Sequence, residues 1–378
     1  MAADSIARDS RLVGGGGMSG AAERLVLDKP EVELTGVAGL AKRLVDFLAE
    51  RREELSPMLI VTHDYPDPDA LAAGFGLQYL AKEGYGIESR IVYRGEVGRT
   101  ENREMVKLLR IPIHKYRPAL LKKHASYVLV DTQPAFENNP FPANRRATVV
   151  IDQHAAPPPL TDLPLVDPDC GASCVIVARA LLDKGIDLPQ RLATAIAYGI
   201  LTDTFEFYRN QRPDVVRTYL DVLPFCDMRK LARVQNPVRP RQFFATLGRG
   251  IREALMYRKT LVTHLGGVDT PDRVAQVAEF LLVYRGVNWC LVTGRYKGKL
   301  HASLRSSRLD AKAGEVLRDT FYDPRQAGGH GPIAGGSCRV GKDISEEAWS
   351  AKEKSLEQRL VRRLRIPARV EPRKVFLR

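Results

Sequence analysis

The chain has 378 residues, of which 44% are hydrophobic and 27% charged, a composition typical of a water-soluble globular protein with about two domains. No run of about 18 apolar residues is present, so a transmembrane helix is not expected. The net charge of +13 favours phosphate-bearing partners, and the odd number of cysteines, five, without a CxxC pair, argues against a disulfide framework or a zinc ribbon and favours the cytoplasm.

Residues 1–34 contain four consecutive glycines and no apolar segment of the kind that a secretory signal needs, so we expect a disordered leader. Helical patterns and short apolar runs then alternate through residues 35–225. This alternation predicts an α/β domain with a doubly wound parallel sheet. The expected helices are 35–54, 70–82, 100–110, 172–184 and 190–202, the expected strands are 58–62, 87–93, 127–130 and 148–151, and the proline-rich residues 156–168 are expected to form a loop.

A second, smaller α/β domain is expected over residues 244–344, after a charged, proline-containing linker at 226–243. Its expected elements are a helix at 272–282, strands at 289–292 and 301–304, and a glycine-rich turn at 328–336. Residues 345–378 form an arginine-rich tail. Binding of long nucleic acid by this tail is not favoured, because aromatic stacking partners beyond Phe376 are absent there.

Acidic and histidine residues stand at the ends of the apolar runs. In an open parallel sheet, ligands bind outside the carboxyl ends of the strands, so we expect these side chains to converge. A single aspartate after a strand is usually a helix cap or turn residue, but the succession of such groups indicates a site. The residues are His63, Asp67 and Asp69, then Asp131, then Asp152 and His154, and finally Asp203 at the end of a helix.

Carboxylates and imidazoles in one place are ligands for Mn²⁺ or Mg²⁺. Without a cation, several carboxylates pressed together would repel one another. Two metal ions about 4 Å apart could share one carboxylate, lower the pKa of water towards neutrality and stabilise the transition-state oxygens.

Six segments of the chain form an ordered set of motifs. They are THDYPDPDA (62–70), VDT (130–132), IDQH (151–154) and GILTDT (199–204) in the first domain, and SLRSS (303–307) and GGHGPIAG (328–335) in the second. These segments resemble the DHH phosphoesterases, a superfamily that includes RecJ exonucleases, nanoRNase/pAp-phosphatases and cyclic-dinucleotide phosphodiesterases. The resemblance spans about residues 57–340 and includes the DHH-associated domain of the nanoRNase branch.

The resemblance implies two Mn²⁺ ions, with Mg²⁺ or Co²⁺ as substitutes. One ion would be held by His63, Asp67 and Asp131, and the other by Asp69, Asp131 and Asp203. Gln153 stands where the family has a histidine ligand of the second metal, and its amide oxygen is a weaker ligand for manganese. His154 matches the histidine that contacts the scissile phosphate, and Asp152 would orient a neighbouring histidine or a metal water.

The second domain has the residues of a substrate clamp. An arginine offers a planar fork for a phosphate, two serines offer hydroxyl donors, and glycines let backbone N–H groups approach an anion. The histidine of the glycine-rich turn could stack on a base or donate to a phosphate. The residues are Arg305, Ser306, Ser307, Gly328, Gly329, His330 and Gly331.

The sequence therefore predicts a Mn²⁺-dependent phosphoesterase, with its site in the cleft between the domains, that hydrolyses short oligoribonucleotides, linear or cyclic dinucleotides, or pAp. One alternative is a nucleotide-binding protein whose catalysis is weakened or lost because of Gln153. A further alternative is an inorganic pyrophosphatase. No membrane partner is expected, and the oligomeric state, a homodimer included, stays open.

Overall fold

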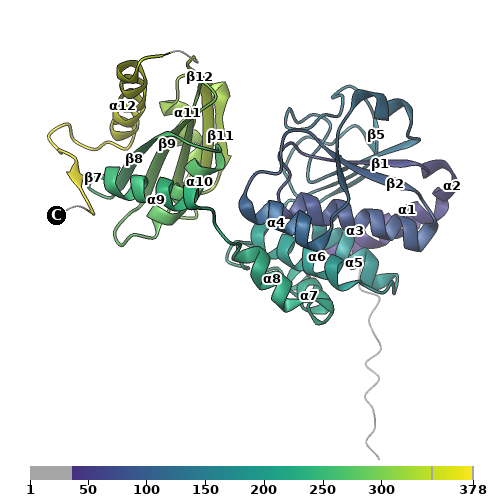
Figure 1. Ribbon diagram of the computed structural model, residues 1–378. Helices are drawn as coiled ribbons and strands as arrows, with labels where there is room; N and C mark the ends of the chain where they lie inside the picture. Colours follow the sequence, from purple (N-terminus) through teal and green to yellow (C-terminus); the bar gives the residue numbers. More distant parts are fainter. Residues whose placement is uncertain (1–35, 342–343, 377–378) are drawn as a thin grey trace, which may run out of the picture.

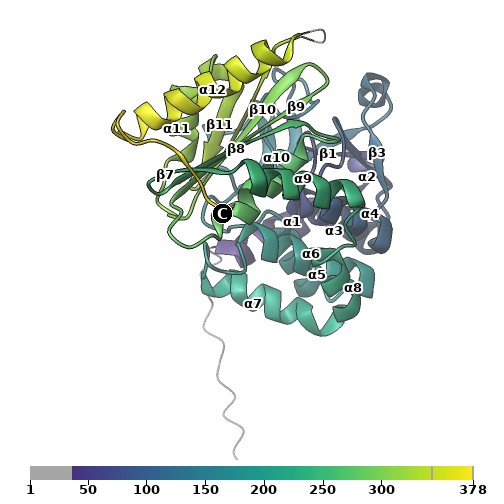
Figure 2. The ribbon, with the colours of Figure 1, turned by 60° about the vertical axis from the view of Figure 1, so that its left-hand side comes forward.

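A computed structural model describes residues 36–341 and 344–376 (Figure 1). The predicted leader, residues 1–34, lies outside the described residues. The chain forms two units, each built on one sheet and joined through the chain after α8. Figure 1 shows the two units side by side, and in the turned view of Figure 2 they overlap. Among the described residues, no helix combines the length and the apolar character needed to cross a membrane.

The first unit has a six-stranded parallel sheet in the order β3-β2-β1-β4-β5-β6. The strands are β1 (Met58–Thr62), β2 (Ser89–Tyr93), β3 (Ile113–Lys115), β4 (Ser126–Val130), β5 (Ala147–Asp152) and β6 (Thr161–Val166). The helices are α1 (Gly36–Glu50), α2 (Arg52–Leu55), α3 (Pro68–Tyr85), α4 (Thr100–Leu109), α5 (Cys174–Asp183), α6 (Gln190–Asp203), α7 (Pro213–Val222) and α8 (Met228–Gln235), with 3-10 turns η1 (Pro118–Lys122) and η2 (Leu223–Phe225).

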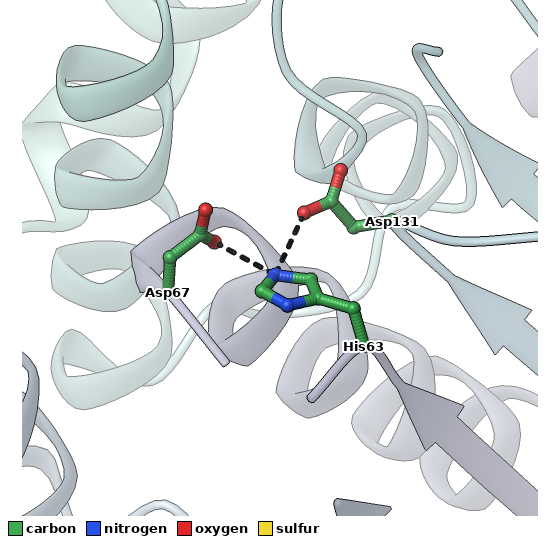
Figure 3. Close-up of side chains that lie close together, drawn as sticks. All are labelled: His63, Asp67 and Asp131. Atoms are coloured by element: carbon green, nitrogen blue, oxygen red, sulfur yellow. Dashed lines mark ion pairs between the residues drawn. The ribbon is translucent and has the colours of Figure 1, made fainter. Parts of the chain in front are cut away.

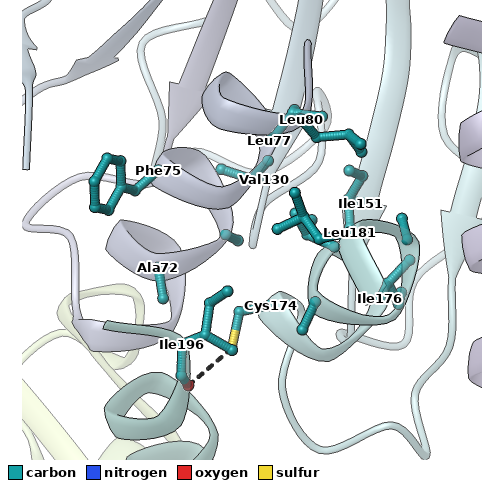
Figure 4. Close-up of a cluster of buried hydrophobic side chains, with 14 of the residues drawn as sticks. Ala72, Phe75, Leu77, Leu80, Val130, Ile151, Cys174, Ile176, Leu181 and Ile196 are labelled. Atoms are coloured by element: carbon teal, nitrogen blue, oxygen red, sulfur yellow. Dashed lines mark hydrogen bonds between the residues drawn. The ribbon is translucent and has the colours of Figure 1, made fainter. Parts of the chain in front are cut away.

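Alternate residues of each central strand point to opposite faces of this sheet, and both faces are buried. Ile60 and Val128 face the large core formed with α1, α3, α5 and α6, whereas Leu59 and Leu129 face a smaller core closed by η1 and Phe141. Figure 4 shows side chains of α3, α5 and α6 packed against Val130 and Ile151. The buried sheet holds the carboxyl ends of the strands rigidly in place.

The second unit has a seven-stranded sheet in the order β11-β12-β10-β9-β8-β7-β13, in which only the β8–β9 pair is parallel. The strands are β7 (Leu255–Tyr257), β8 (Thr260–Gly267), β9 (Trp289–Tyr296), β10 (Lys299–Ser306), β11 (Ala327–His330), β12 (Ile333–Arg339) and β13 (Arg373–Lys374). The helices are α9 (Arg241–Glu253), α10 (Asp272–Leu282), α11 (Ala313–Thr320) and α12 (Glu346–Arg363), with the 3-10 turn η3 (Pro324–Gln326).

Three expectations from the sequence need correction. Residues 156–168 are not only loop, because they contain β6, which forms the edge of the first sheet. Pro164 is tolerated there because proline, which has no backbone N–H, is found in edge strands. The expected linker at 226–243 is mostly helical, and only residues 236–240 lie between α8, which packs on α4 and α6, and α9. The glycine-rich turn at 328–336 is a hairpin of β11 and β12.

The arginine-rich residues 345–376 are part of the second unit and not a separate tail, and residues 377–378 lie outside the described residues. One side of α12 is buried against the sheet through Trp349, Leu356 and Leu360. Further along, β13 adds to the sheet edge by pairing with β7. The helix has an apolar stripe at helical spacing, which the many arginines conceal in the sequence.

Candidate metal centre

The order of the first sheet creates a switch point between β1 and β4. Successive connections lead from β1 outwards through β2 to β3, and from β4 outwards in the other direction through β5 to β6. The loops that leave β1 and β4 therefore diverge, and the carboxyl edge between them is open to a ligand. His63 follows β1, Asp131 follows β4 and Asp152 ends β5, so the strands themselves bring these residues to this edge.

His63 points one ring nitrogen at two carboxylates, as Figure 3 shows. Its Nε2 lies 3.3 Å from Asp131 Oδ2 and 3.7 Å from Asp67 Oδ1. The other nitrogen, Nδ1, lies 2.7 Å from the carbonyl oxygen of Asp64. A proton on Nδ1 would be held by this carbonyl, leaving Nε2 as a ligand atom. Asp67 is fixed as the N-cap of α3 by accepting from the backbone N–H of Ala70 at 3.1 Å.

Asp69 is fully buried in the first turn of α3, and two backbone donors hold it. The N–H groups of Ser173 and Cys174, at the start of α5, donate to its two carboxylate oxygens at 2.7 and 2.8 Å. Asp203, the last residue of α6, approaches the same place from another direction. Asp69, Asp131 and Asp203 each offer an oxygen within 4.8 Å of the others.

Asp131 is the residue that all the ligand groups share. It belongs to three groups of converging ligand atoms, the first with His63 and Asp67, the second with Asp69 and Asp203, and a third with Asp152 and His154. Its backbone has the left-handed value φ = 56°, uncommon for an aspartate, and its side chain is buried. Ser173 Oγ donates to Asp131 Oδ1 at 3.0 Å.

Gln153 is placed among the three acids of the second group. Its Nε2 donates to Asp203 Oδ2 at 2.6 Å and lies 3.3 Å from Asp69 Oδ2 and 3.4 Å from Asp131 Oδ1. The residue that replaces the family histidine is thus directed at the carboxylates, as a ligand of the second metal would have to be.

His154 stands at the outer side of the centre and is held by Asp152. Its Nδ1 lies 2.8 Å from Asp152 Oδ1 and 3.7 Å from Asp131 Oδ1. Gln133 supports this pair, because its Nε2 donates to Asp152 Oδ2 at 2.7 Å and to the carbonyl oxygen of His154 at 2.9 Å. The hydrogen bond to Asp152 raises the pKa of His154 to about 9 although partial burial opposes the charge. At neutral pH His154 is therefore a cation in the metal-free chain.

Asp69, Asp131 and Asp203 are unfavourable as anions without a counter-charge. Burial, together with the neighbouring carboxylates, raises the pKa of Asp69 and of Asp203 well above the usual range, and burial raises that of Asp131. Burial opposes a charge on His63, but hydrogen bonds to Asp131 and Asp67 outweigh it, so the pKa of His63 is also well above its usual value. A divalent cation would offset both the burial of these carboxylates and their mutual repulsion. Oxygen and imidazole donors suit Mn²⁺ or Mg²⁺, so the residues fit such an ion.

The predicted clamp residues lie on the second unit, and several already have partners within it. The guanidinium of Arg305 is buried, donates to the carbonyl oxygens of Leu304 and Ala334, and lies 3.3 Å from Glu279. Glu279 also pairs, at 2.7 Å, with Arg99 of the first unit. The sequence missed Glu279, because a single glutamate on a helix carries no signal of such a contact.

The other clamp residues differ in their exposure and in whether their polar groups already have hydrogen-bond partners. Ser306 Oγ donates to the carbonyl oxygen of Asn288, whereas Ser307 is exposed. Gly328 and Gly329 lie in β11, and Gly331, with φ = 49°, is in the turn to β12. The side chain of His330 lies outside what the structure describes.

A family model decides the identity of the first unit. Residues 57–200 match the DHH family, N-terminal domain. The first unit is a DHH-family domain. This unit brings together at the switch point the residues that follow its strands and end its helix α6. They are His63, Asp67 and Asp69, then Asp131, then Asp152 and His154, and finally Asp203. The predicted DHH-family domain and the predicted α/β architecture are thereby confirmed.

Relatives of known sequence match beyond the DHH domain. The chain is 28% identical over 314 residues to an uncharacterized protein of Methanocaldococcus jannaschii, covering 81% of this chain and 63% of the relative. It is 25% identical to the bifunctional oligoribonuclease and PAP phosphatase NrnA of Thermus thermophilus, covering 81% of this chain and 91% of NrnA. A probable manganese-dependent inorganic pyrophosphatase of Streptococcus equi subsp. zooepidemicus matches only 40% of this chain, over 49% of its own length, at 25% identity.

A solved structure shares the fold of both units. The exopolyphosphatase-related protein of Bacteroides fragilis superposes with a TM-score of 0.67, covering 86% of this chain and 98% of its own, at 16% identity. The folds of the two units thus recur together in one protein. At this level of identity the likeness concerns the fold alone.

Proposed function

We propose that this DHH protein is a Mn²⁺-dependent phosphoesterase that hydrolyses small nucleotides. The observation that carries the proposal is the sharing of Asp131, whose carboxylate joins the group of His63 and Asp67 to the group of Asp69 and Asp203 at the sheet's switch point. Two ligand groups with one common carboxylate are what a pair of adjacent divalent cations requires. The match to NrnA along 81% of this chain supports a small-nucleotide substrate.

The residues have separate tasks in this proposal. His63, Asp67 and Asp131 hold one ion, and Asp69, Asp131 and Asp203 hold the other, with Gln153 beside them. When bound, such ions lower the pKa of water and stabilise charge on phosphoryl oxygens. His154, whose Nδ1 is held 2.8 Å from Asp152 Oδ1, neutralises charge on the phosphate or donates a proton to the leaving oxygen. Arg305, Ser307 and the glycines of the β11–β12 hairpin bind the rest of the nucleotide.

A turnover screen tests this function. The purified full chain with Mn²⁺ is offered pApA, cyclic di-AMP, short RNAs, pAp and pyrophosphate, beside the Asp131→Ala variant and a sample with excess EDTA. We expect hydrolysis of at least one nucleotide, little of pyrophosphate, and none without metal or in the variant. Full activity of Asp131→Ala would refute the shared carboxylate. Preferred cleavage of pyrophosphate would move the assignment to the pyrophosphatases, of which one similar protein matches only 40% of the chain.

One observation favours a second candidate, a nucleotide-binding protein with weakened catalysis. The amide of Gln153 donates to Asp203 at 2.6 Å and so partly replaces a cation in the second group. Binding of a nucleotide without turnover of any of the substrates in the screen would favour this candidate.

A cytoplasmic location is part of the proposal, since the five cysteines, all within the described residues, are free thiols.

A further inference from the structure

The turn that follows Asp203 has an unusual backbone. Phe205, Glu206 and Phe207 all have left-handed φ values, of 53°, 54° and 63°. None is a glycine, and left-handed backbone is unfavourable for residues with a Cβ atom, most of all for three in succession. Such strain persists only where the surroundings impose it, so the turn must be held by its contacts.

Those contacts come from both ends of the turn. Thr204 is buried, and its hydroxyl donates to the carbonyl oxygen of Ile200 at 2.6 Å and accepts from the N–H of Phe207 at 3.2 Å. The ring of Phe207 packs edge-on against Tyr219, with centroids 5.0 Å apart. Buried anchors therefore hold a turn whose other side chains face solvent.

The far end of the turn is tied to the loop that supports the metal centre. Asn210 Nδ2 donates to the carbonyl oxygen of Asp169 at 2.6 Å, and a Cβ atom at Gly171 would lie 2.5 Å from the same nitrogen. This loop leads into Ser173, which donates to both Asp69 and Asp131. The turn is thus continuous with the centre through Asp203 on one side and through the loop on the other.

The strained backbone leaves two aromatic rings in solvent, two and five residues after Asp203 along the chain. Phe205 is 56% exposed and Tyr208 is 60% exposed, with ring centroids 6.2 Å apart. The guanidinium of Arg209 lies 5.4 Å from the Phe205 ring centroid. Large apolar rings exposed together mark a contact surface, and a cation beside them favours a partner with negative charge.

We propose that Phe205, Tyr208 and Arg209 form a stacking platform for the nucleobase adjacent to the phosphate in the metal centre. A base with its phosphate fits this surface, because every base has a face that stacks on an aromatic ring and the arginine complements the phosphate backbone. The platform acts through stacking, so it selects nucleotides over base-free phosphates without strong preference among bases. The inference rests on the proposed function only in taking the ligand to be a nucleotide.

Binding of two probes that differ only by the base tests the platform. The full chain with Mn²⁺ is titrated calorimetrically with AMP and with ribose 5-phosphate, which share the phosphate and the sugar. We expect AMP to bind roughly 5- to 150-fold more tightly than ribose 5-phosphate. The double variant F205A/Y208A should lose most of this ratio and keep its affinity for ribose 5-phosphate, whereas F205Y/Y208F, which retains both rings, should keep the ratio.

Each outcome decides. Equal affinities of the unaltered chain for the two probes would overturn the platform, and so would an AMP preference that survives in F205A/Y208A. Equal losses for both probes in that variant would show a role in folding only, and a thermal melt checks this directly. If the double variant does not fold, the single variant Tyr208→Ala, at a more exposed ring, replaces it. Because no turnover is measured, failure of the proposed hydrolysis would leave this test intact.

Discussion

The side-chain nitrogen of Gln153 lies 2.6 Å from a carboxylate oxygen of Asp203. The same amide is within 3.4 Å of Asp69 and Asp131, so one neutral side chain touches all three acids of the second ligand group. An imidazole at this position would offer a nitrogen lone pair to a metal, whereas the amide offers donors to the acids and, on rotation, only a weak oxygen ligand.

The variant Gln153→His should therefore bind its second Mn²⁺ more tightly than the unaltered chain, by about tenfold or more. Equilibrium dialysis followed by elemental analysis measures the number of ions bound and their affinity. Gln153→Asn is the matched control, because it keeps an amide and should show no gain. Two tight ions of similar affinity in the unaltered chain would contradict this view of Gln153.

The thermal stability of the metal-free protein should depend on pH through the acids of the centre. The pKa values of Asp69 and Asp203 lie well above 3.8 in the folded chain, so these groups hold protons that the unfolded chain has lost, and their contribution falls as the pH rises above about 4. His154 acts in the same direction, because its folded pKa of about 9 exceeds 6.5 and its contribution is lost as the pH passes 9.

Thermal melts between about pH 5 and pH 9, with EDTA or with Mn²⁺, measure this effect. We expect the melting temperature of the EDTA-treated protein to fall with rising pH and Mn²⁺ to remove most of the decline. Asp203→Asn, which removes one of the repelling charges, should show a smaller decline without metal. If the melting temperature fell equally steeply with pH in the presence and absence of Mn²⁺, the acids of the centre would not be its cause.

Replacing Asp152 should lower the pKa of His154. The hydrogen bond that His154 Nδ1 donates to the Asp152 carboxylate is the largest cause of the raised value of about 9, so Asp152→Asn should move the pKa towards 6.5. An NMR titration of the imidazole protons in the metal-free protein measures the shift. His301 on β10, whose pKa burial lowers, is an internal reference that should not move. An unchanged pKa of His154 in this variant would mean that another interaction keeps the imidazole protonated.

Ser173→Ala should weaken metal binding without unfolding the protein. The hydroxyl of Ser173 donates to Asp131 Oδ1 at 3.0 Å and orients the shared carboxylate, and loss of such a supporting hydrogen bond lowers metal affinity by about 10- to 100-fold. Calorimetric titration with Mn²⁺ measures the loss. Ser126→Ala is the matched control, since Ser126 is also buried but donates to Leu55 far from the centre. Equal Mn²⁺ affinities for the two variants would show that the Ser173 hydroxyl does not support metal binding.

Much of the first unit follows from local sequence patterns. The run Met58–Thr62 and the helical pattern from Ala70 to Lys82 predict β1 and most of α3, because a buried strand is continuously apolar and a helix repeats its apolar residues every three to four positions. Other elements lack such signals. The strand β6 contains Pro164 and only three inward-facing residues, and the apolar stripe of α12 is interrupted by charged residues.

The sequence by itself determined which residue types end the strands, and hence that His63, Asp131 and Asp152 share one edge of a parallel sheet. The tertiary structure alone decided that Ser173 and Gln133 orient those residues, that Gln153 touches three acids and that Arg305 is tied to Glu279. The physical reason is that strand and helix periodicity is a property of neighbouring residues along the chain. A hydrogen bond between distant residues depends on how the finished elements pack, and a single serine or glutamine gives no sign of it beforehand.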